Sequence, residues 1–146
     1  MTIQRLDNIG VVVHDMEAVI AFFLELGLEL EGKATVEGPD VDRLVALEGV
    51  KCDLAVVRTP DGHGRLELMK FHSPASPTAA EPNAPVNAPG FRRIMFAVDD
   101  IEEILPRLRA HGAEVMGDLV KYENGYQLVY VRGPEGIIVA LAKKIA

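Results

Sequence analysis

Two oppositely charged residues interrupt apolar, strand-like segments of the chain. Glu67 lies in the segment RLELM, and Arg93 lies in the segment FRRIMF. A positioned carboxylate can act as a general base, and a guanidinium binds carboxylate, enolate or phosphate oxygens through paired hydrogen bonds. We therefore predict that Arg93 binds an anionic group of a small ligand and that Glu67 serves as general base or hydrogen-bond acceptor. The alternative is that these two side chains pair with each other and only stabilise the fold.

Other side chains are predicted to share the strand faces of these two residues. Met69 and Met95 each lie two positions further along the chain, and alternate residues of a strand project from the same face. Flexible methionines suit an adaptable apolar wall, so we predict that both contact the ligand. Tyr126 and Tyr130 lie on one later strand segment, where they could line the same site or belong to the core.

The elements that position these residues are duplicated. Residues 9–30 match residues 94–115 at an offset of 85 positions, with six identities in twenty-two positions. Average residue usage predicts only about one or two identities, so the self-similarity indicates a repeated module. The same offset aligns Asn8 with Arg93, which makes Asn8 a further candidate for ligand binding.

Each copy of the module reads as strand, helix and three strands. Helical spacing of apolar residues predicts helices at residues 16–26 and 101–111, with Asp15 and Asp100 as N-caps and Gly27 and Gly112 at the C-terminal ends. Pro106 lies inside the second helix, where we expect a kink or an early start. Alternating apolar residues predict strands at 6–13, 29–36, 52–59, 65–71, 91–98, 113–120, 126–132 and 137–142, and a short helical turn is predicted at 41–47.

This pattern predicts an α+β protein of two tandem βαβββ modules. Each half would keep an exposed sheet face, so we expect an incurved, mixed eight-stranded sheet around a shared cavity. We assign residues 5–71 to module one, residues 72–89 to a proline-rich linker and residues 90–146 to module two, all within one domain. The linker could be a surface connection, or an arm that covers a pocket or reaches a partner subunit.

Composition excludes several classes of protein. The 146 residues are 49% hydrophobic and 25% charged, as is usual for a globular protein. A net charge of −7 without a stripe of Lys and Arg argues against nucleic-acid binding. No apolar segment is long enough to cross a bilayer and no signal peptide is recognisable, so we expect a cytoplasmic protein without a membrane partner. Cys52 is the single cysteine, and its alternating context predicts a buried strand residue.

Four segments resemble, in the correct order, the motifs of the vicinal oxygen chelate superfamily. This superfamily includes glyoxalase I, bleomycin-resistance, methylmalonyl-CoA epimerase and extradiol dioxygenase types. The segments are LDNIGVVVHDMEAVIAFFLELGLEL at 6–30, TPDGHGRLEL at 59–68, GFRRIMFAVDDIEE at 90–103 and RGPEGIIVAL at 132–141. The resemblance implies the glyoxalase/bleomycin resistance/dihydroxybiphenyl dioxygenase-like fold, a homodimer, and a small-molecule ligand or substrate.

The resemblance also assigns the positions of a metal site, and there this chain departs from the family. Metal-dependent members hold a divalent ion with one side chain from the first and last strand of each module. Those positions carry Asn8, Glu67, Arg93 and Ala140 here, in place of a set with two histidines and a second glutamate. Arg93 stays protonated and cannot ligate. We therefore expect no metal or other cofactor, with a divalent ion at Glu67 as the less favoured alternative.

The four histidines do not restore a metal site. No two of them share the spacing of a ligand pair such as that of an HExxH motif. They lie after the first strand, in a turn, at the start of the linker and at the end of a helix: His14, His63, His72 and His111.

By resemblance, this protein binds a small oxygenated organic molecule in a cavity between the modules. If it is an enzyme, lyase, isomerase or dioxygenase chemistry is implied, in which an enediolate-like oxyanion must be stabilised. Arg93 would then supply the positive charge that a metal supplies elsewhere. The alternative is a non-catalytic protein that sequesters a drug or metabolite, as bleomycin-resistance members do, and a third possibility is a degenerate structural or regulatory copy.

Overall fold

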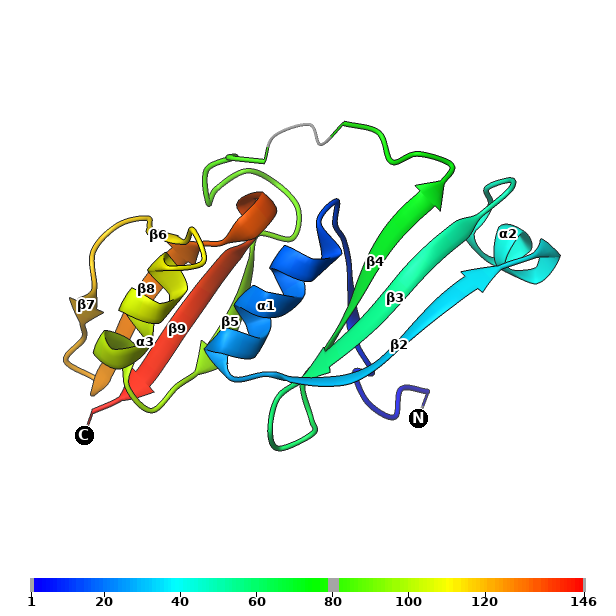
Figure 1. The fold of residues 1–146 in the computed structure, drawn as a ribbon. Helices are drawn as coiled ribbons and strands as arrows, with labels where there is room; N and C mark the ends of the chain where they lie inside the picture. Colours follow the sequence, from blue (N-terminus) through cyan, green and yellow to red (C-terminus); the bar gives the residue numbers. More distant parts are fainter. Residues whose placement is uncertain (1, 79–81, 146) are drawn as a thin grey trace. The chain divides into compact units, whose positions relative to one another are not determined.

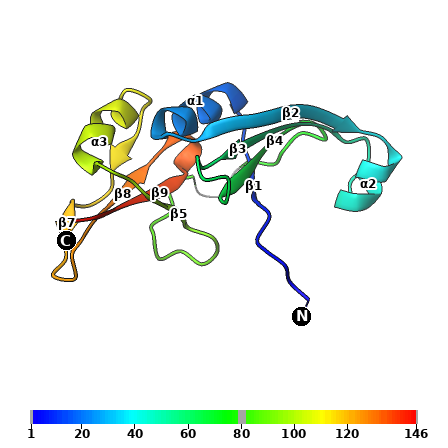
Figure 2. The same cartoon turned by 90° about the horizontal axis from the view of Figure 1, so that it is seen from below.

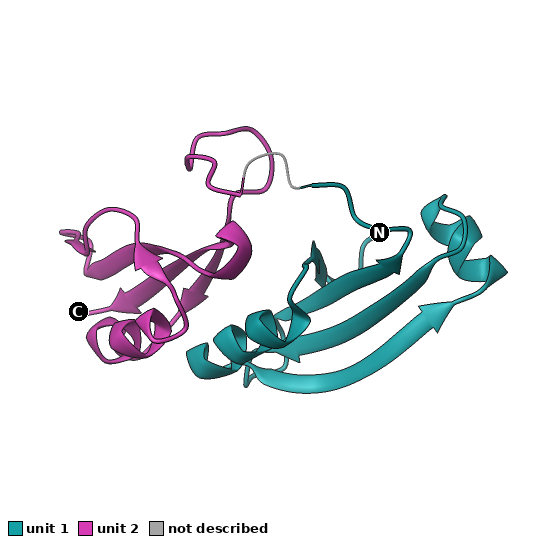
Figure 3. Ribbon diagram, turned by 45° about the horizontal axis from the view of Figure 1, so that its top comes forward, with its two compact units in different colours: residues 1–78 teal, residues 79–146 magenta. Residues whose placement is uncertain are grey.

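The computed structural model describes residues 2–78 and 82–145, and its elements are labelled in Figure 1. The chain divides into two compact units, residues 1–78 and residues 79–146, which are distinguished by colour in Figure 3. Positions 79–81 of the predicted linker lie outside the described residues. In the part of the chain that is described, no helix has the length and apolar character that a membrane span requires.

The first unit packs a helix on a mixed sheet of four strands in the order β1-β4-β3-β2. Strands β1 and β4 pair in parallel, whereas β2, β3 and β4 pair in antiparallel fashion. Helix α1 lies along one face of this sheet (Figure 2). The elements are β1 (Ile9–Val12), α1 (Met16–Leu26), β2 (Glu29–Glu37), α2 (Pro39–Val45), β3 (Lys51–Arg58) and β4 (Arg65–Ser73).

Helix α1 begins and ends where its capping residues predict. The Asp15 carboxylate accepts a hydrogen bond from the Ala18 amide at 3.1 Å, and Gly27 ends the helix with φ at +121°, a conformation that glycine adopts easily. The buried face of the helix consists of Val19, Ile20, Phe22 and Phe23. The buried sheet residues of β3 and β4 on the same side are Ala55, Val57, Leu66 and Leu68.

The opposite face of this sheet, which we call the first open face, carries the alternate residues. Val56 pairs with Glu67 and Leu54 pairs with Met69, so these side chains project from the face away from α1. Strand β2 contains a β-bulge between Leu30 and Gly32, which changes the alternation of its side chains.

The second unit repeats the arrangement on a five-stranded sheet. Its order is β5-β9-β8-β6, with β7 also paired to β8, and β5 and β9 are parallel. Helix α3 buries Ile101, Ile104, Leu105 and Leu108. The buried residues on the sheet face that α3 covers are Val129, Val131, Val139 and Leu141. The elements are β5 (Arg93–Ala97), α3 (Ile101–Arg109), β6 (Glu114–Val115), β7 (Val120–Lys121), β8 (Tyr126–Arg132), the short 3₁₀ turn η1 (Pro134–Gly136) and β9 (Ile138–Lys144).

The predicted α+β class and fold type are confirmed, but the second module departs from the prediction in detail. The single strand predicted at 113–120 is two short strands, so the described residues form nine strands in two sheets and not eight. Gly117 and Asp118 lie in the interruption, and both residue types disfavour strands. Helix α3 begins at Ile101, so Pro106 does not mark its start, and Ala110 is its C-cap in place of the predicted Gly112.

The described part of the linker that follows position 81 is held on the second unit by one arginine. Arg132 Nη1 donates to the carbonyl oxygens of Pro82 at 3.1 Å and Gly136 at 3.2 Å, and Nη2 donates to the Ala84 carbonyl at 2.8 Å. Ala84 is buried. Residues 82–84 therefore belong structurally to the second unit.

Candidate functional site

Three predicted site residues of the first unit lie along its first open face. Glu67 of β4 lies opposite Val56 of β3 and beside Gly10 of β1. Met69 follows on the same side of β4, and its terminal methyl covers Gly10, because a Cβ added there would be 2.8 Å from it. Asn8 lies one residue before β1, at the position that continues the alternation of Gly10. The structure thus places Glu67 and Met69 on β4 and Asn8 just before the neighbouring strand β1.

Four predicted residues of the second unit share one face of its sheet. We call this face, opposite α3, the second open face. Met95 of β5 and Tyr130 of β8 flank Ala140 of the intervening strand β9. Arg93 and Tyr126 occupy alternate positions on β5 and β8 and therefore project from the same face. Tyr126 is 39% exposed and Tyr130 is half-buried, so neither is a core residue.

Arg93 makes an aromatic contact that the sequence did not predict. Its Cζ lies 5.7 Å from the centroid of the Tyr130 ring, within the range of a cation–π interaction. Strand β9 separates β5 from β8, so the Arg93 side chain must cross β9 to reach this ring. Arg93 pairs with Ile138 and Tyr130 pairs with Ala140, so the side chain passes over β9 between these two positions, and Ala140 has no exposed surface. The small side chain at position 140 therefore leaves the space that the guanidinium occupies.

The arginines of the first open face differ from Arg93 because they are neutralised. The Glu31 carboxylate accepts hydrogen bonds from Arg65 at 3.0 Å and from Arg58 at 3.5 Å, and Arg58 also pairs with Glu29 at 3.4 Å. These contacts, led by the hydrogen bond from Arg65, hold the pKa of Glu31 below its usual range. Among the described residues, Arg93 has no such acidic partner. Its N–H donors remain available to a ligand.

The residues at the family's metal positions do not fit a divalent ion. Ala140 has no donor atom, and Arg93 carries a permanent positive charge and no acceptor. Asn8 offers a weak carbonyl oxygen, which leaves Glu67 as a single strong ligand, whereas a protein-built site needs about three or four. Across residues 2–78 and 82–145, no group of three or more His, Cys, Asp or Glu side chains is arranged to hold a metal.

A polar cluster on the α1 side of the first sheet was not predicted from the sequence. The Asp53 carboxylate accepts a hydrogen bond from the Thr35 hydroxyl at 2.8 Å, and His72 Nε2 lies 2.7 Å from its other oxygen. Hydrogen bonds from His72 and then Thr35 hold the pKa of Asp53 below its usual range. The three residues lie on adjacent strands β2, β3 and β4, and only knowledge of the strand pairing could have brought them together.

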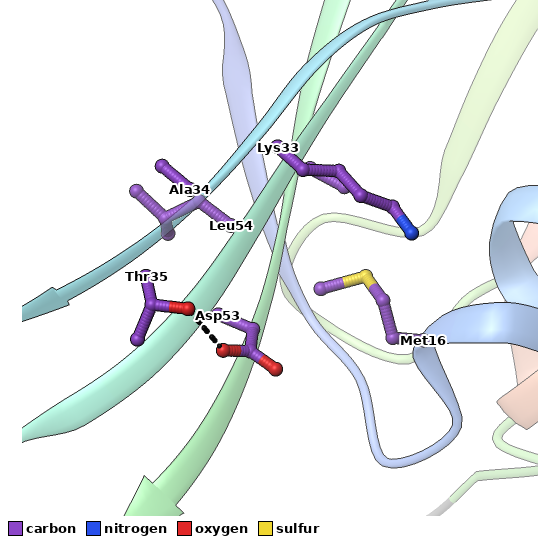
Figure 4. A pocket seen from close by; sticks show the side chains of 7 residues that line it. Met16, Lys33, Ala34, Thr35, Asp53 and Leu54 are labelled. Atoms are coloured by element: carbon purple, nitrogen blue, oxygen red, sulfur yellow. Dashed lines mark hydrogen bonds between the residues drawn. The ribbon is translucent and has the colours of Figure 1, made fainter.

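A hollow of about 330 Å³ lies beside this cluster, at the start of α1. Figure 4 shows the lining side chains, which come from α1, β2 and β3. They are Met16, Lys33, Ala34, Thr35, Asp53, Leu54 and Ala55. None of them was a predicted site residue, because each is unremarkable within its own segment.

Cys52 is not a candidate nucleophile. Its side chain is 2% exposed, as its alternating context predicted. Burial raises the pKa of the thiol, so the reactive thiolate is disfavoured at neutral pH.

The fold and its two open sheet faces define a class of protein, and comparison with sequences of known families identifies that class. The chain belongs to the Glyoxalase/Bleomycin resistance protein/Dioxygenase superfamily, whose sequence model matches residues 5–141.

Individual proteins resemble the chain over nearly its whole length. A solved glyoxalase family protein from Bacillus cereus is 45% identical, with a TM-score of 0.94 and coverage of 100% of this chain and 97% of that one. The protein YwbC of Bacillus subtilis (strain 168) is 26% identical over 136 residues, which are 91% of this chain and 92% of YwbC. An antibiotic binding protein from a Streptomyces species is 21% identical, with a TM-score of 0.60 and coverage of 99% and 98%, a likeness of fold alone.

Proposed function

We propose that this protein binds a small oxygenated organic molecule with a carboxylate or developing oxyanion, and that it does so without a divalent metal. The single observation that carries the proposal is the Arg93 guanidinium, stacked on Tyr130 and without an acidic partner among the described residues. In metal-dependent members of this superfamily, the resemblance implies that the corresponding strand position holds a metal ligand. Here a fixed organic cation takes the place of the ion as the group that attracts oxygen anions.

The surroundings of Arg93 support a binding role. The contact with Tyr130 favours orientations of the exposed Arg93 guanidinium over the ring, which reduces the entropy lost when a ligand binds. The ring stabilises the cation from one side without using its N–H donors, so these donors can form paired hydrogen bonds with a planar carboxylate. Met95 lies two residues along β5 and is 43% exposed, so it adds an adaptable apolar contact next to the charge.

The role of Glu67 decides whether the protein is an enzyme or only binds its ligand. Glu67 forms no ion pair among the described residues, so its carboxylate is free to accept a proton or a hydrogen bond from a ligand. If Glu67 is a general base, it would take a proton from the ligand, and an oxyanion would form on the ligand. If it is not, the protein sequesters its ligand unchanged. The Streptomyces relative, described as an antibiotic binding protein, makes sequestration the second candidate function.

Binding of mandelate tests the role of Arg93, with its methyl ester as the uncharged control. Calorimetry should show that mandelate binds and that the ester binds at least about tenfold more weakly, because one charge-assisted pair is lost. Arg93→Met should weaken mandelate binding by a similar factor, whereas Arg109→Met, which removes an exposed arginine of α3, should leave it unchanged. Equal mandelate affinity in the Arg93→Met protein and the unaltered protein would refute the proposal.

A second experiment distinguishes catalysis from sequestration. Hemithioacetal, catechol and acyl-CoA substrates should be assayed with and without added divalent ions, before and after treatment with a chelator. Turnover that survives the chelator and is lost in Glu67→Gln, with mandelate binding retained, would identify Glu67 as the general base. Tight binding without turnover would support sequestration. Stoichiometric metal retained through the chelator treatment would contradict the metal-free part of the proposal.

A further inference from the structure

The hollow beside α1 has the character of a second ligand site. It lies on the α1 side of the first sheet, so it is separate from the first open face that carries Glu67. Its volume of about 330 Å³ falls at the lower end of the range of small-molecule pockets, about 300–1,000 Å³. Its lining is about equally polar and apolar: the side chains of Lys33, Thr35 and Asp53 share this side of the sheet with Ala55, and Met16 of α1 lies opposite them (Figure 4).

The hollow contains one cation and one anion that are not paired with each other. Within the described residues, no ion pair joins Lys33 to Asp53 or to any other carboxylate. Lys33 pairs across the strands with Ala55, and Thr35 pairs with Asp53, so Lys33 and Asp53 are diagonal neighbours on adjacent strands. The backbone positions of such diagonal neighbours are about 7–8 Å apart, a separation that a small molecule can bridge.

The Asp53 carboxylate is fixed in position but not saturated. Thr35 and His72 each occupy one site on its two oxygens, at 2.8 Å and 2.7 Å. An ionised carboxylate offers about four acceptor sites, so two remain for a ligand. The same hydrogen bonds keep Asp53 ionised at neutral pH by lowering its pKa.

We propose that this hollow binds a small zwitterion of the α-amino-acid type. Lys33 binds the carboxylate of the ligand, Asp53 accepts hydrogen bonds from its ammonium group, and the Met16 thioether contacts its short apolar side chain. A simple anion would meet the Asp53 carboxylate, and a simple cation would meet the Lys33 ammonium. A molecule with both charges satisfies both groups at once.

Three probes of equal carbon skeleton test this assignment. They are 2-aminobutyrate, which carries both charges, butyrate, which carries only the anion, and butylamine, which carries only the cation. Each is titrated into the ¹⁵N-labelled full chain while amide chemical shifts are followed. Saturable shifts at residues 33–35 and 53–55 are expected with 2-aminobutyrate, and butyrate and butylamine should bind at least about tenfold more weakly, because each lacks one charge-assisted contact.

Matched variants locate the effect in the hollow. Lys33→Met should abolish the saturable shifts, whereas Lys121→Met, at an exposed lysine of β7, should leave them intact. Arg93→Met should also leave them intact, so a failed mandelate experiment would not affect this one. An amide spectrum of the Lys33→Met protein as well dispersed as that of the unaltered protein would show that it is folded. Equal binding of butyrate and 2-aminobutyrate, or shifts unchanged in Lys33→Met, would overturn the assignment.

Discussion

Gly136 offers a sharp test of how the segment that begins at Pro82 is held on the second unit. Its φ is +81°, so alanine there costs about 1 kcal/mol in backbone energy alone. An alanine Cβ would also lie 1.7 Å from the Pro82 carbonyl oxygen, so the segment must move. That movement removes the hydrogen bond from Arg132 to Pro82 and weakens the one to Ala84, at an added cost of about 1–3 kcal/mol. We expect Gly136→Ala to lower the free energy of unfolding by about 2–4 kcal/mol.

The matched control for this change is Gly112→Ala. Gly112 belongs to the same unit, its φ is +86°, and a Cβ there would meet no atom within 4 Å. Urea denaturation followed by circular dichroism should therefore show a loss of about 1 kcal/mol for this control and a clearly larger loss for Gly136→Ala. Arg132→Met should cause a stability loss similar to the difference between the losses of the two glycine variants. Equal losses for the two glycine variants would refute the idea that a contact with Pro82, and not backbone strain, makes Gly136 necessary.

Two further predictions concern the first unit. Phe22 of α1 is fully buried, so Phe22→Ala should lower the free energy of unfolding, measured by urea denaturation, by about 3–5 kcal/mol. Leu24→Ala, at a side chain that is 40% exposed, should lower it by well under half of that. Similar losses for the two variants would contradict the packing described. The pKa of Asp53 is held below its ordinary value of 3.8, so its ionised form stabilises the fold above that pH, and the stabilisation is lost as the pH falls through the lowered pKa. The stability difference between the unaltered protein and Asp53→Asn should therefore stay constant between about pH 6 and about pH 5 and shrink as the pH falls below about 4. A difference independent of pH in that lower range would show that the His72 and Thr35 contacts do not favour the carboxylate.

Local periodicity was sufficient to predict much of the fold. The helix predicted at residues 16–26 and the strand predicted at 126–132 have the observed bounds, because capping residues and alternation are properties of short segments. The same alternation correctly grouped Glu67 with Met69 and Arg93 with Met95 on common strand faces. The strand predicted at 113–120 was wrong, although Gly117 in its middle could have warned of the interruption.

The contacts that give these faces their chemistry could not be predicted in the same way. The stacking of Arg93 on Tyr130 depends on β9 lying between β5 and β8 and on the small side chain of Ala140 at the crossing. Neither fact is contained in a local pattern. The position of Lys33 and Asp53 at the same hollow likewise depends on the register of β2 with β3, which the bulge after Leu30 shifts by one residue.

This bulge changes which side chains of β2 face helix α1. Before it, Leu30 pairs with Val57 on the α1 side, and after it Lys33 pairs with Ala55 on that same side, so the extra residue reverses which positions face the helix. The extra residue is Glu31, and deleting it would make the alternation regular and keep Lys33 opposite Ala55, but it would remove the carboxylate that Arg58 and Arg65 share. A change of one residue in chain length would thus leave the cation in the hollow and alter the charge balance of the opposite face alone.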